Sequence, residues 1–232
     1  HLKKCFLLLF NLELYSQCLI VYPKMKPKET TVYSMKFNRK SVRQQSYLTD
    51  ERFPYFIIYR DEQFDNVADK LQFDMFSVFR DRQITKSITC HKQDGSSLWV
   101  IKARNINDDG QGVTHISDYD VYLPKEKAVG LSAYRYVNDY SVYLTPNMTY
   151  NPRVIENLPG TIADGSVAVL IPKKPLRLTK RQRAYFSTEE YRRFYGIARN
   201  LSTQSINVDK TSVYFYGVLK EDDEYYFTEI FG

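Results

Sequence analysis

Short runs of β-branched and aromatic residues, bounded by turn-forming residues, recur along this chain and limit what it can fold into. Four of them are FPYFIIY (residues 53–59), SLWVIKA (97–103), GSVAVLI (165–171) and SVYFYGVL (212–219). Runs of this length and composition predict short strands, because such side chains fit a pleated surface that is buried on at least one side.

Weaker patterns of the same kind extend the strand prediction. Residues 118–123 and 132–137 are also expected to be strands. A strand at 141–144 would pair with residues 132–137 through the turn-like pair Asn138-Asp139. Near the chain end, residues 225–230 are expected to form a hairpin with the run at 212–219.

Two segments have the period of a helix instead. The first has apolar residues at i, i+3, i+4 and i+7, the spacing of a short amphipathic helix: Phe64, Val67, Ala68 and Leu71. The second begins with a capping-box pattern, in which Ser187 is the N-cap and Glu190 follows three residues later. Its predicted apolar stripe consists of Tyr191, Phe194, Tyr195 and Ala198.

The predicted fold class is α+β, with short, largely antiparallel and twisted strands and two or three helices. Strands and helices do not alternate regularly, which argues against a doubly wound parallel sheet. A length of 232 residues corresponds to one large domain or two small ones. We expect a lead-in or linker over residues 1–47, which is rich in basic and polar residues and contains Pro23 and Pro27, and a domain over residues 48–232.

The N-terminus and the cysteines bear on the compartment. The apolar run at residues 5–10 is shorter than the roughly 20 residues that cross a bilayer, so we expect a packed helix or strand there and no membrane partner. The three cysteines include no CxxC pair. This pattern favours neither a disulfide framework nor a zinc site, and a cytoplasmic location is the expectation.

Basic residues are concentrated in one stretch of the chain. The whole chain has 33 Lys and Arg against 27 Asp and Glu. Between residues 173 and 200 only Glu189 and Glu190 oppose nine basic residues: Lys173, Lys174, Arg177, Lys180, Arg181, Arg183, Arg192, Arg193 and Arg199. A solvated helix face explains such a run as well as a polyanion partner does. The abundance of Arg and the polar run ARNLSTQSIN (198–207) favour a nucleic acid, because these side chains bind phosphates and base edges.

Enzyme motifs in the sequence are incomplete. The string KQDG (92–95) matches KxDG, in which a lysine accepts a nucleotide, but Asp-Gly is also a common turn signal. The string NPR (151–153) only partly matches the NPPY motif of adenine methyltransferases. His91 and His115 lack companions at metal-ligand spacing. We therefore predict no catalytic residue, no metal and no cofactor in this chain.

Several strings fall in an order that resembles a known family. They are FPYFIIYRDEQFDNVADKL (53–71), FSVFRDRQITKS (76–87), LWVIKARNINDDG (98–110), YLTPNMTYNPR (143–153), GSVAVLIPK (165–173) and FSTEEYRRFYGIARNLSTQSINVDKTSVYFYG (186–217). The chain thus resembles the TaqI-like C-terminal target-recognition (specificity) domain of adenine-specific DNA methyltransferases from type II restriction–modification systems. The similarity covers roughly residues 48–220.

The resemblance implies sequence-specific recognition of double-stranded DNA. In that family a separate N-terminal domain carries the catalytic motifs and binds S-adenosylmethionine. The expected partners of this chain are therefore double-stranded DNA and a methyltransferase catalytic domain or subunit, with S-adenosylmethionine bound there and not here.

The predicted DNA-binding residues combine this resemblance with side-chain chemistry. A first group comprises Arg80, Arg82, Lys86, Lys102, Arg104 and Asn105, although Arg80-Asp81-Arg82 would equally suit an internal salt bridge. A second comprises Arg192, Arg199, Asn200, Ser202, Thr203, Gln204, Ser205 and Asn207. A third comprises Thr149, Asn151 and Arg153. Lys173, Lys174 and Arg181 complete the set from the basic stretch.

Two other functions remain open on the sequence alone. The many short strands are compatible with a structural or assembly protein. The KxDG match and the scattered carboxylates are compatible with a nuclease or a nucleotidyl-transfer enzyme that uses Lys92.

Overall fold

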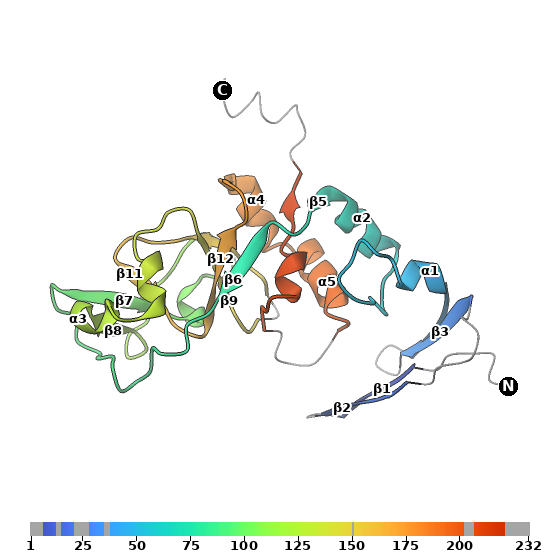
Figure 1. The fold of residues 1–232 in the computed structure, drawn as a ribbon, viewed down its shortest axis with the longest axis horizontal. Helices are drawn as coiled ribbons and strands as arrows, with labels where there is room; N and C mark the ends of the chain where they lie inside the picture. The colour runs from blue at the N-terminus through green and yellow to red at the C-terminus, as the bar shows by residue number, and fades with distance from the viewer. Residues whose placement is uncertain are drawn as a thin grey trace, which may run out of the picture.

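The computed structural model describes residues 7–12, 15–20, 28–34, 38–149, 151–201 and 207–220. Its elements are helices and short, mostly antiparallel strands arranged in several small sheets, so the predicted α+β class is confirmed. Figure 1 shows an elongated arrangement, with β7, β8 and α3 at one end and α1, α2 and β3 toward the other.

A four-stranded sheet occupies the middle of the molecule. Its strand order is β10 (Ile155–Glu156), β9 (Tyr143–Pro146), β12 (Val167–Pro172) and β6 (Phe76–Phe79), and every neighbouring pair is antiparallel. The run predicted at 165–171 is confirmed as a buried strand, since residues 167–170 of β12 are all buried. Two of its side chains, Ala168 and Leu170, belong to one hydrophobic cluster, while Val167 and Val169 belong to another.

A three-stranded sheet lies at one end of the molecule (Figure 1). Its order is β11 (Thr161–Ala163), β7 (Ser97–Ile101) and β8 (Val121–Pro124), with β11 parallel to β7 and β8 antiparallel to it. The strands predicted at 97–103 and 118–123 are confirmed with different bounds, since β7 ends at Ile101 and β8 begins only at Val121 and ends at Pro124. The short elements η1 (Ala103–Asn105), α3 (Lys125–Ala128) and η2 (Ser132–Tyr136) accompany this sheet.

Helices and aromatic side chains form the largest core. Helix α2 (Glu62–Lys70) confirms the amphipathic pattern and contacts α5 (Glu189–Ala198), whose predicted stripe is fully buried. Phe64 of α2 stacks on Phe194 of α5 with 4.7 Å between ring centroids. Helix α4 (Lys180–Tyr185), η3 (Ser212–Phe215), β5 (Leu71–Gln72) and β13 (Val218–Leu219) complete this part.

The strand predicted at residues 53–59 is wrong. These residues are turns and irregular backbone with no strand pairing. Phe53 and Ile57 are buried in the core around α2, whereas Phe56 is 59% exposed. The apolar side chains are therefore buried from an irregular loop. The Ile58 N–H and the Phe56 carbonyl of this loop bond to the side chain of Asn200 and not to a neighbouring strand.

The hairpin predicted around Asn138 is also wrong. The residues predicted as its first strand form the 3-10 helix η2, and Asn138 adopts a left-handed φ of 64° that ends this segment. Strand β9 instead pairs with β10 and β12. Burial explains why β9 pairs with these strands, since β9 is buried along its whole length and lies between β10 and β12 in the sheet.

The start of α5 differs from the prediction by one residue. Thr188, not Ser187, is the N-cap, and its hydroxyl accepts from the Tyr191 N–H at 3.2 Å. Ser187 lies beside Gly110 instead, and its hydroxyl is buried without a hydrogen-bond partner among the described residues. The capping box predicted between Ser187 and Glu190 is therefore wrong, although the helix and its apolar stripe are confirmed.

Near the C-terminus the run at 212–219 divides into two elements. It forms η3 and then β13, which pairs with β5 in antiparallel fashion. The predicted partner strand at 225–230 lies outside the described residues.

Two hairpins precede the main body. Strands β1 (Leu7–Leu12) and β2 (Tyr15–Ile20) pair with each other, as do β3 (Glu29–Ser34) and β4 (Arg39–Gln44), which leads into α1 (Gln45–Leu48). The segment predicted as a lead-in thus contains regular structure. Among the described residues, no helix has the length and apolar character needed to cross a membrane.

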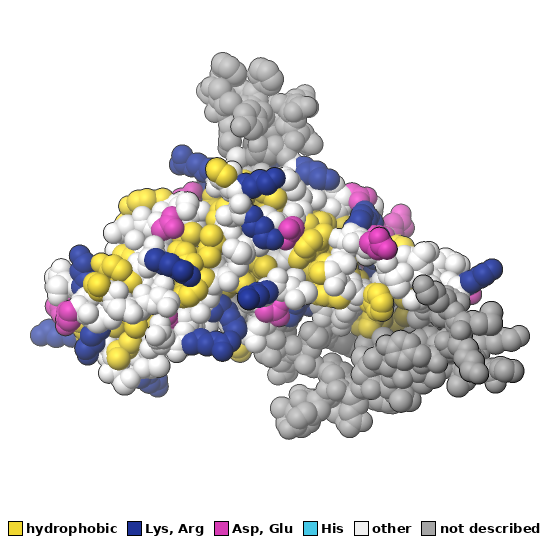
Figure 2. Space-filling model, in the orientation of Figure 1, with side chains coloured by type: hydrophobic (Ala, Val, Ile, Leu, Met, Phe, Trp, Pro, Cys, Tyr) yellow, Lys and Arg dark blue, Asp and Glu magenta, His cyan; other side chains and the backbone are white. Residues whose placement is uncertain are grey.

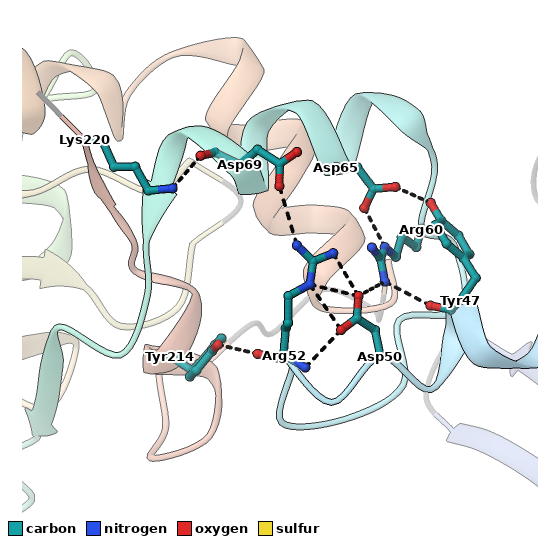
Figure 3. Close-up of polar contacts among 8 residues, drawn as sticks. All are labelled: Tyr47, Asp50, Arg52, Arg60, Asp65, Asp69, Tyr214 and Lys220. Atoms are coloured by element: carbon teal, nitrogen blue, oxygen red, sulfur yellow. Dashed lines mark hydrogen bonds and ion pairs between the residues drawn. The ribbon is translucent and has the colours of Figure 1, made fainter. Parts of the chain in front are cut away.

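An ion-pair network fastens α1 to α2 (Figure 3). The guanidinium of Arg60, only 4% exposed, contacts Asp50 and Asp65 and donates to the Tyr47 carbonyl at 2.9 Å. The Tyr47 hydroxyl donates in turn to Asp65 at 2.6 Å. Tyr47, the last residue of the predicted lead-in, is thereby joined to the predicted domain, whose boundary at residue 48 stays a prediction.

Candidate nucleic-acid interface

Loops from both sheets meet at one edge of the molecule. Strands β6 and β9 end where the antiparallel strand β12 begins, because Phe79 pairs with Val169 and Pro146 pairs with Val167. The parallel strands β7 and β11 end beside this edge. We call the loops at this edge the rim, defined as residues 80–87, 102–108, 147–149, 151–153 and 163–166.

Hydrogen bonds join the rim loops to one another. The Asn147 backbone N–H donates to the Ser166 carbonyl at 2.8 Å, and the Ser166 hydroxyl accepts from the Ala103 N–H at 2.9 Å. A Cβ at Gly165 would lie 2.7 Å from the Asp81 carbonyl oxygen, so only glycine permits this close approach. The first and third predicted groups are thus brought together.

Arg153 is buried beneath the rim. Its guanidinium donates to the carbonyls of Ile106 at 3.2 Å and Asn151 at 3.0 Å, and it lies 3.4 Å from the Asp108 carboxylate. Burial lowers the pKa of this guanidinium despite the attraction of Asp108. The Thr149 hydroxyl also donates to the Asn151 carbonyl. These side chains hold two rim loops together.

Asn105 has no exposed surface. Its side-chain oxygen accepts from the Lys102 N–H at 3.0 Å, and its amide nitrogen donates to the Thr114 carbonyl and to Asp120. All of its side-chain polar atoms therefore have partners within the chain, and its role in the described structure is to shape η1.

Asn200 is occupied in the same way. Its side-chain oxygen accepts from the Ile58 N–H at 2.6 Å, and its amide nitrogen donates to the Phe56 carbonyl at 2.8 Å. It also adopts a left-handed φ of 53°, which Asn tolerates better than most residues. Asn200 thus ends α5 and holds the irregular loop that the sequence had suggested was a strand.

The remaining residues of the second group lie next to the rim or outside the described chain. Asn207 forms a β-bridge with Met148, and its carbonyl accepts from Arg199 at 3.4 Å. Arg192 is exposed on α5, close enough to Arg153 for their charges to repel. Ser202, Thr203, Gln204 and Ser205 fall outside the described residues.

Several predicted cations on the rim are exposed. Arg82, Lys86 and Arg104 are solvent-exposed, and Arg80 and Lys102 are partly so. Within the described residues no salt bridge joins Asp81 to Arg80 or Arg82. Asp81 instead accepts from the N–H groups of Gln83 and Ile84, each at 2.7 Å, and so shapes the turn that follows β6.

The basic stretch does not form a single face. Lys173 and Lys174 directly follow the other end of β12, which is six residues long and so separates them from the rim by roughly 20 Å. Arg181 lies further along the chain, in α4. Ion pairs join Lys173 to Asp74, Arg183 to Glu156 and Arg193 to Asp61. On the face of the molecule seen in Figure 2, Lys and Arg side chains are spread among acidic and apolar groups.

The residues considered for enzymatic roles also have defined places. Lys92 is exposed in a turn, where Asp94 accepts from the Ser96 N–H at 2.9 Å. His115 stacks on Trp99 at 3.7 Å between ring centroids and contacts Asp120 at 2.7 Å. Within the described part of the chain no three His, Cys, Asp or Glu side chains are grouped as a metal site would need.

Sequence reasoning missed two residues that organise the rim. Tyr119 lies beneath Lys102 and Arg104. Asn147 joins its own rim loop to the loop at 163–166, and its carbonyl also accepts from the Val208 N–H. A Tyr in a polar loop gives no periodic signal. The string Asp164-Gly165-Ser166 does signal a turn, but not what the turn contacts.

Comparison with known proteins adds no relative. No family model matches the sequence, and no curated protein matches it significantly.

Proposed function

We propose that this chain recognises specific sequences in double-stranded DNA, as the specificity domain of a restriction–modification adenine methyltransferase. Methyl transfer and S-adenosylmethionine binding would belong to a separate catalytic domain or subunit. The family resemblance supports the proposal on the sequence side. On the structural side, the observation that carries it is the gathering of loops from five strands into one rim with exposed cations.

The rim combines two kinds of side chain that a DNA-recognition domain needs, buried polar groups and exposed cations. Buried polar side chains such as Arg153 and Asn105 hold its loops in place. Exposed cations such as Arg82 remain free to face a polyanion. Phosphate contacts would fix the register of the duplex, while base-edge contacts would select the sequence. Arg192, exposed on α5 beside the rim, is our candidate for a base contact, because Arg forks onto guanine.

The test is selection of bound duplexes from a random library, followed by affinity measurements on the selected and a scrambled sequence. Six phosphate contacts would give a log–log slope of affinity against salt of about −5. R192A should lose about 1–3 kcal/mol on the selected site and relax one position of it. R177A, a substitution of an exposed cation away from the rim, is the control. Binding that is weak, insensitive to salt and blind to sequence would refute the proposal.

A further inference from the structure

Two cations share one aromatic ring on the rim. The Lys102 Nζ lies 3.6 Å from the centroid of the Tyr119 ring, and the Arg104 guanidinium carbon lies 4.7 Å from the same centroid. The Lys102 ammonium also donates to the Tyr119 carbonyl. Attraction between cations and the ring quadrupole holds both side chains near one place.

Charged groups near Lys102 act on its ammonium group. Burial is the largest influence on Lys102 and, together with the charges of Arg104 and Lys86, it lowers the pKa of the ammonium. Asp164 and Asp120 act in the opposite direction. We call Lys102, Arg104 and Tyr119 the Tyr119 cluster.

The nearby carboxylates are engaged with other donors. Asp164 accepts from the backbone N–H and the hydroxyl of Ser166, at 2.8 and 2.5 Å, and burial raises the pKa of its carboxyl group. Asp120 accepts from Asn105 and contacts His115. Neither carboxylate forms an ion pair within 4 Å with a cation of the cluster in the described structure, so Lys102 and Arg104 have no carboxylate partner there.

The chemistry of this arrangement suits a phosphate. Like charges brought together repel, and an anion between them relieves that repulsion. Arg offers a planar fork to phosphate oxygens, and Lys offers a compact point charge. The ring of Tyr119 already contacts two cations, so the cluster presents charge to solvent more than an aromatic face on which a base could stack.

Building on the proposed function, we propose that the Tyr119 cluster binds one phosphate group of the DNA backbone and anchors the duplex to the rim without reading its sequence.

The decisive experiment measures affinity against salt for two duplexes of different sequence. One lost phosphate contact reduces the slope by about 0.9 and, at 50 mM salt, the affinity by roughly tenfold. R104A should show both changes equally on the two duplexes. R177A, which removes an exposed cation beyond the other end of β12 and outside the predicted DNA-binding set, should leave slope and affinity unchanged. R104K keeps the charge and should keep the slope. A loss in R104A that is absent in R104K is therefore due to the missing charge and not to misfolding.

The outcomes separate this inference from the proposed function. An unchanged slope in R104A overturns the phosphate site, and a loss confined to one duplex assigns Arg104 to base reading instead. If the wild type binds no duplex, the proposed DNA function fails. Inorganic phosphate then tests the cluster by itself, at constant ionic strength. Quenching or enhancement of Trp99 fluorescence in the wild type but not in R104A supports the anion site, and no difference between them overturns it.

Trp99 is a suitable reporter for that titration. It is the one Trp among 20 Tyr, so it can be excited selectively. It lies on β7 and stacks on His115, which contacts Asp120, the neighbour of Tyr119.

Discussion

At the scale of single residues, the type of a side chain proved a weaker guide than its partners. Asn105, Arg153 and Asn200 have the chemistry to contact a base or a phosphate. In the structure each is bonded to backbone groups of this chain. Arg82, Lys86 and Arg104 carry the same kind of chemistry and remain exposed. For Asn105 and Arg153 the difference lies in burial, because a buried polar group without a partner is costly. Asn200 is only half-buried, and its two bonds to the loop at 53–59 set its role instead.

Asn200 gives a direct test of such a structural role. N200A removes two hydrogen bonds and places Ala at a left-handed φ of 53°. We expect it to lower the free energy of unfolding by about 2 kcal/mol, measured by urea denaturation. N200G loses the same bonds without the strain and should lose about 1 kcal/mol less. Equal stability of N200A and the wild type would show that these bonds contribute nothing.

At the scale of elements, periodic segments followed the sequence and non-periodic ones did not. The stripes of α2 and α5 are buried as their spacing predicts. The apolar run at 53–59 gave a wrong strand, because a continuous apolar run specifies burial and leaves the backbone conformation open. The boundary of α5 was misplaced by one residue because Ser187 and Thr188 are both good caps, and packing against Gly110 decided between them.

The two neighbouring hydroxyls at the start of α5 give a matched pair of substitutions. T188A removes the cap and should lower the free energy of unfolding by about 1 kcal/mol. S187A removes a buried hydroxyl that has no partner in the described part of the chain, so its effect should be near zero or slightly stabilising. Thermal or urea denaturation of both variants measures this difference. A larger loss of unfolding free energy in S187A than in T188A would instead support Ser187 as the N-cap.

At the scale of the whole molecule, the ion pairs that fasten α1 and the loop after it to α2 have a defined response to pH. Hydrogen bonds from Arg52 are the main reason that the pKa of Asp50 lies well below its usual range (Figure 3). A carboxylate with a depressed folded-state pKa contributes stability that is present above its unfolded pKa of about 3.9 and lost as the pH falls further. The network around Arg60 should therefore weaken in acid.

We expect D50N to remove this part of the acid sensitivity. The stability difference between the wild type and D50N should be largest near neutral pH and should shrink as the pH falls from about 5 toward 2. Urea denaturation at a series of pH values measures it. D69N, at an exposed ion pair with Arg52, is the control and should change little at any pH. A difference that stays constant between pH 7 and pH 2 would contradict the assignment.

The sequence by itself determined the α+β class, the helices α2 and α5 and the buried strands β7 and β12, because hydrophobic periodicity is a local property of the chain. Only the tertiary structure decided which polar side chains face solvent. The bond between Ile58 and Asn200 joins residues 142 positions apart, and no local pattern encodes such a partner. The same reason divided the basic stretch, since the length of β12 carries its first residues away from the rim.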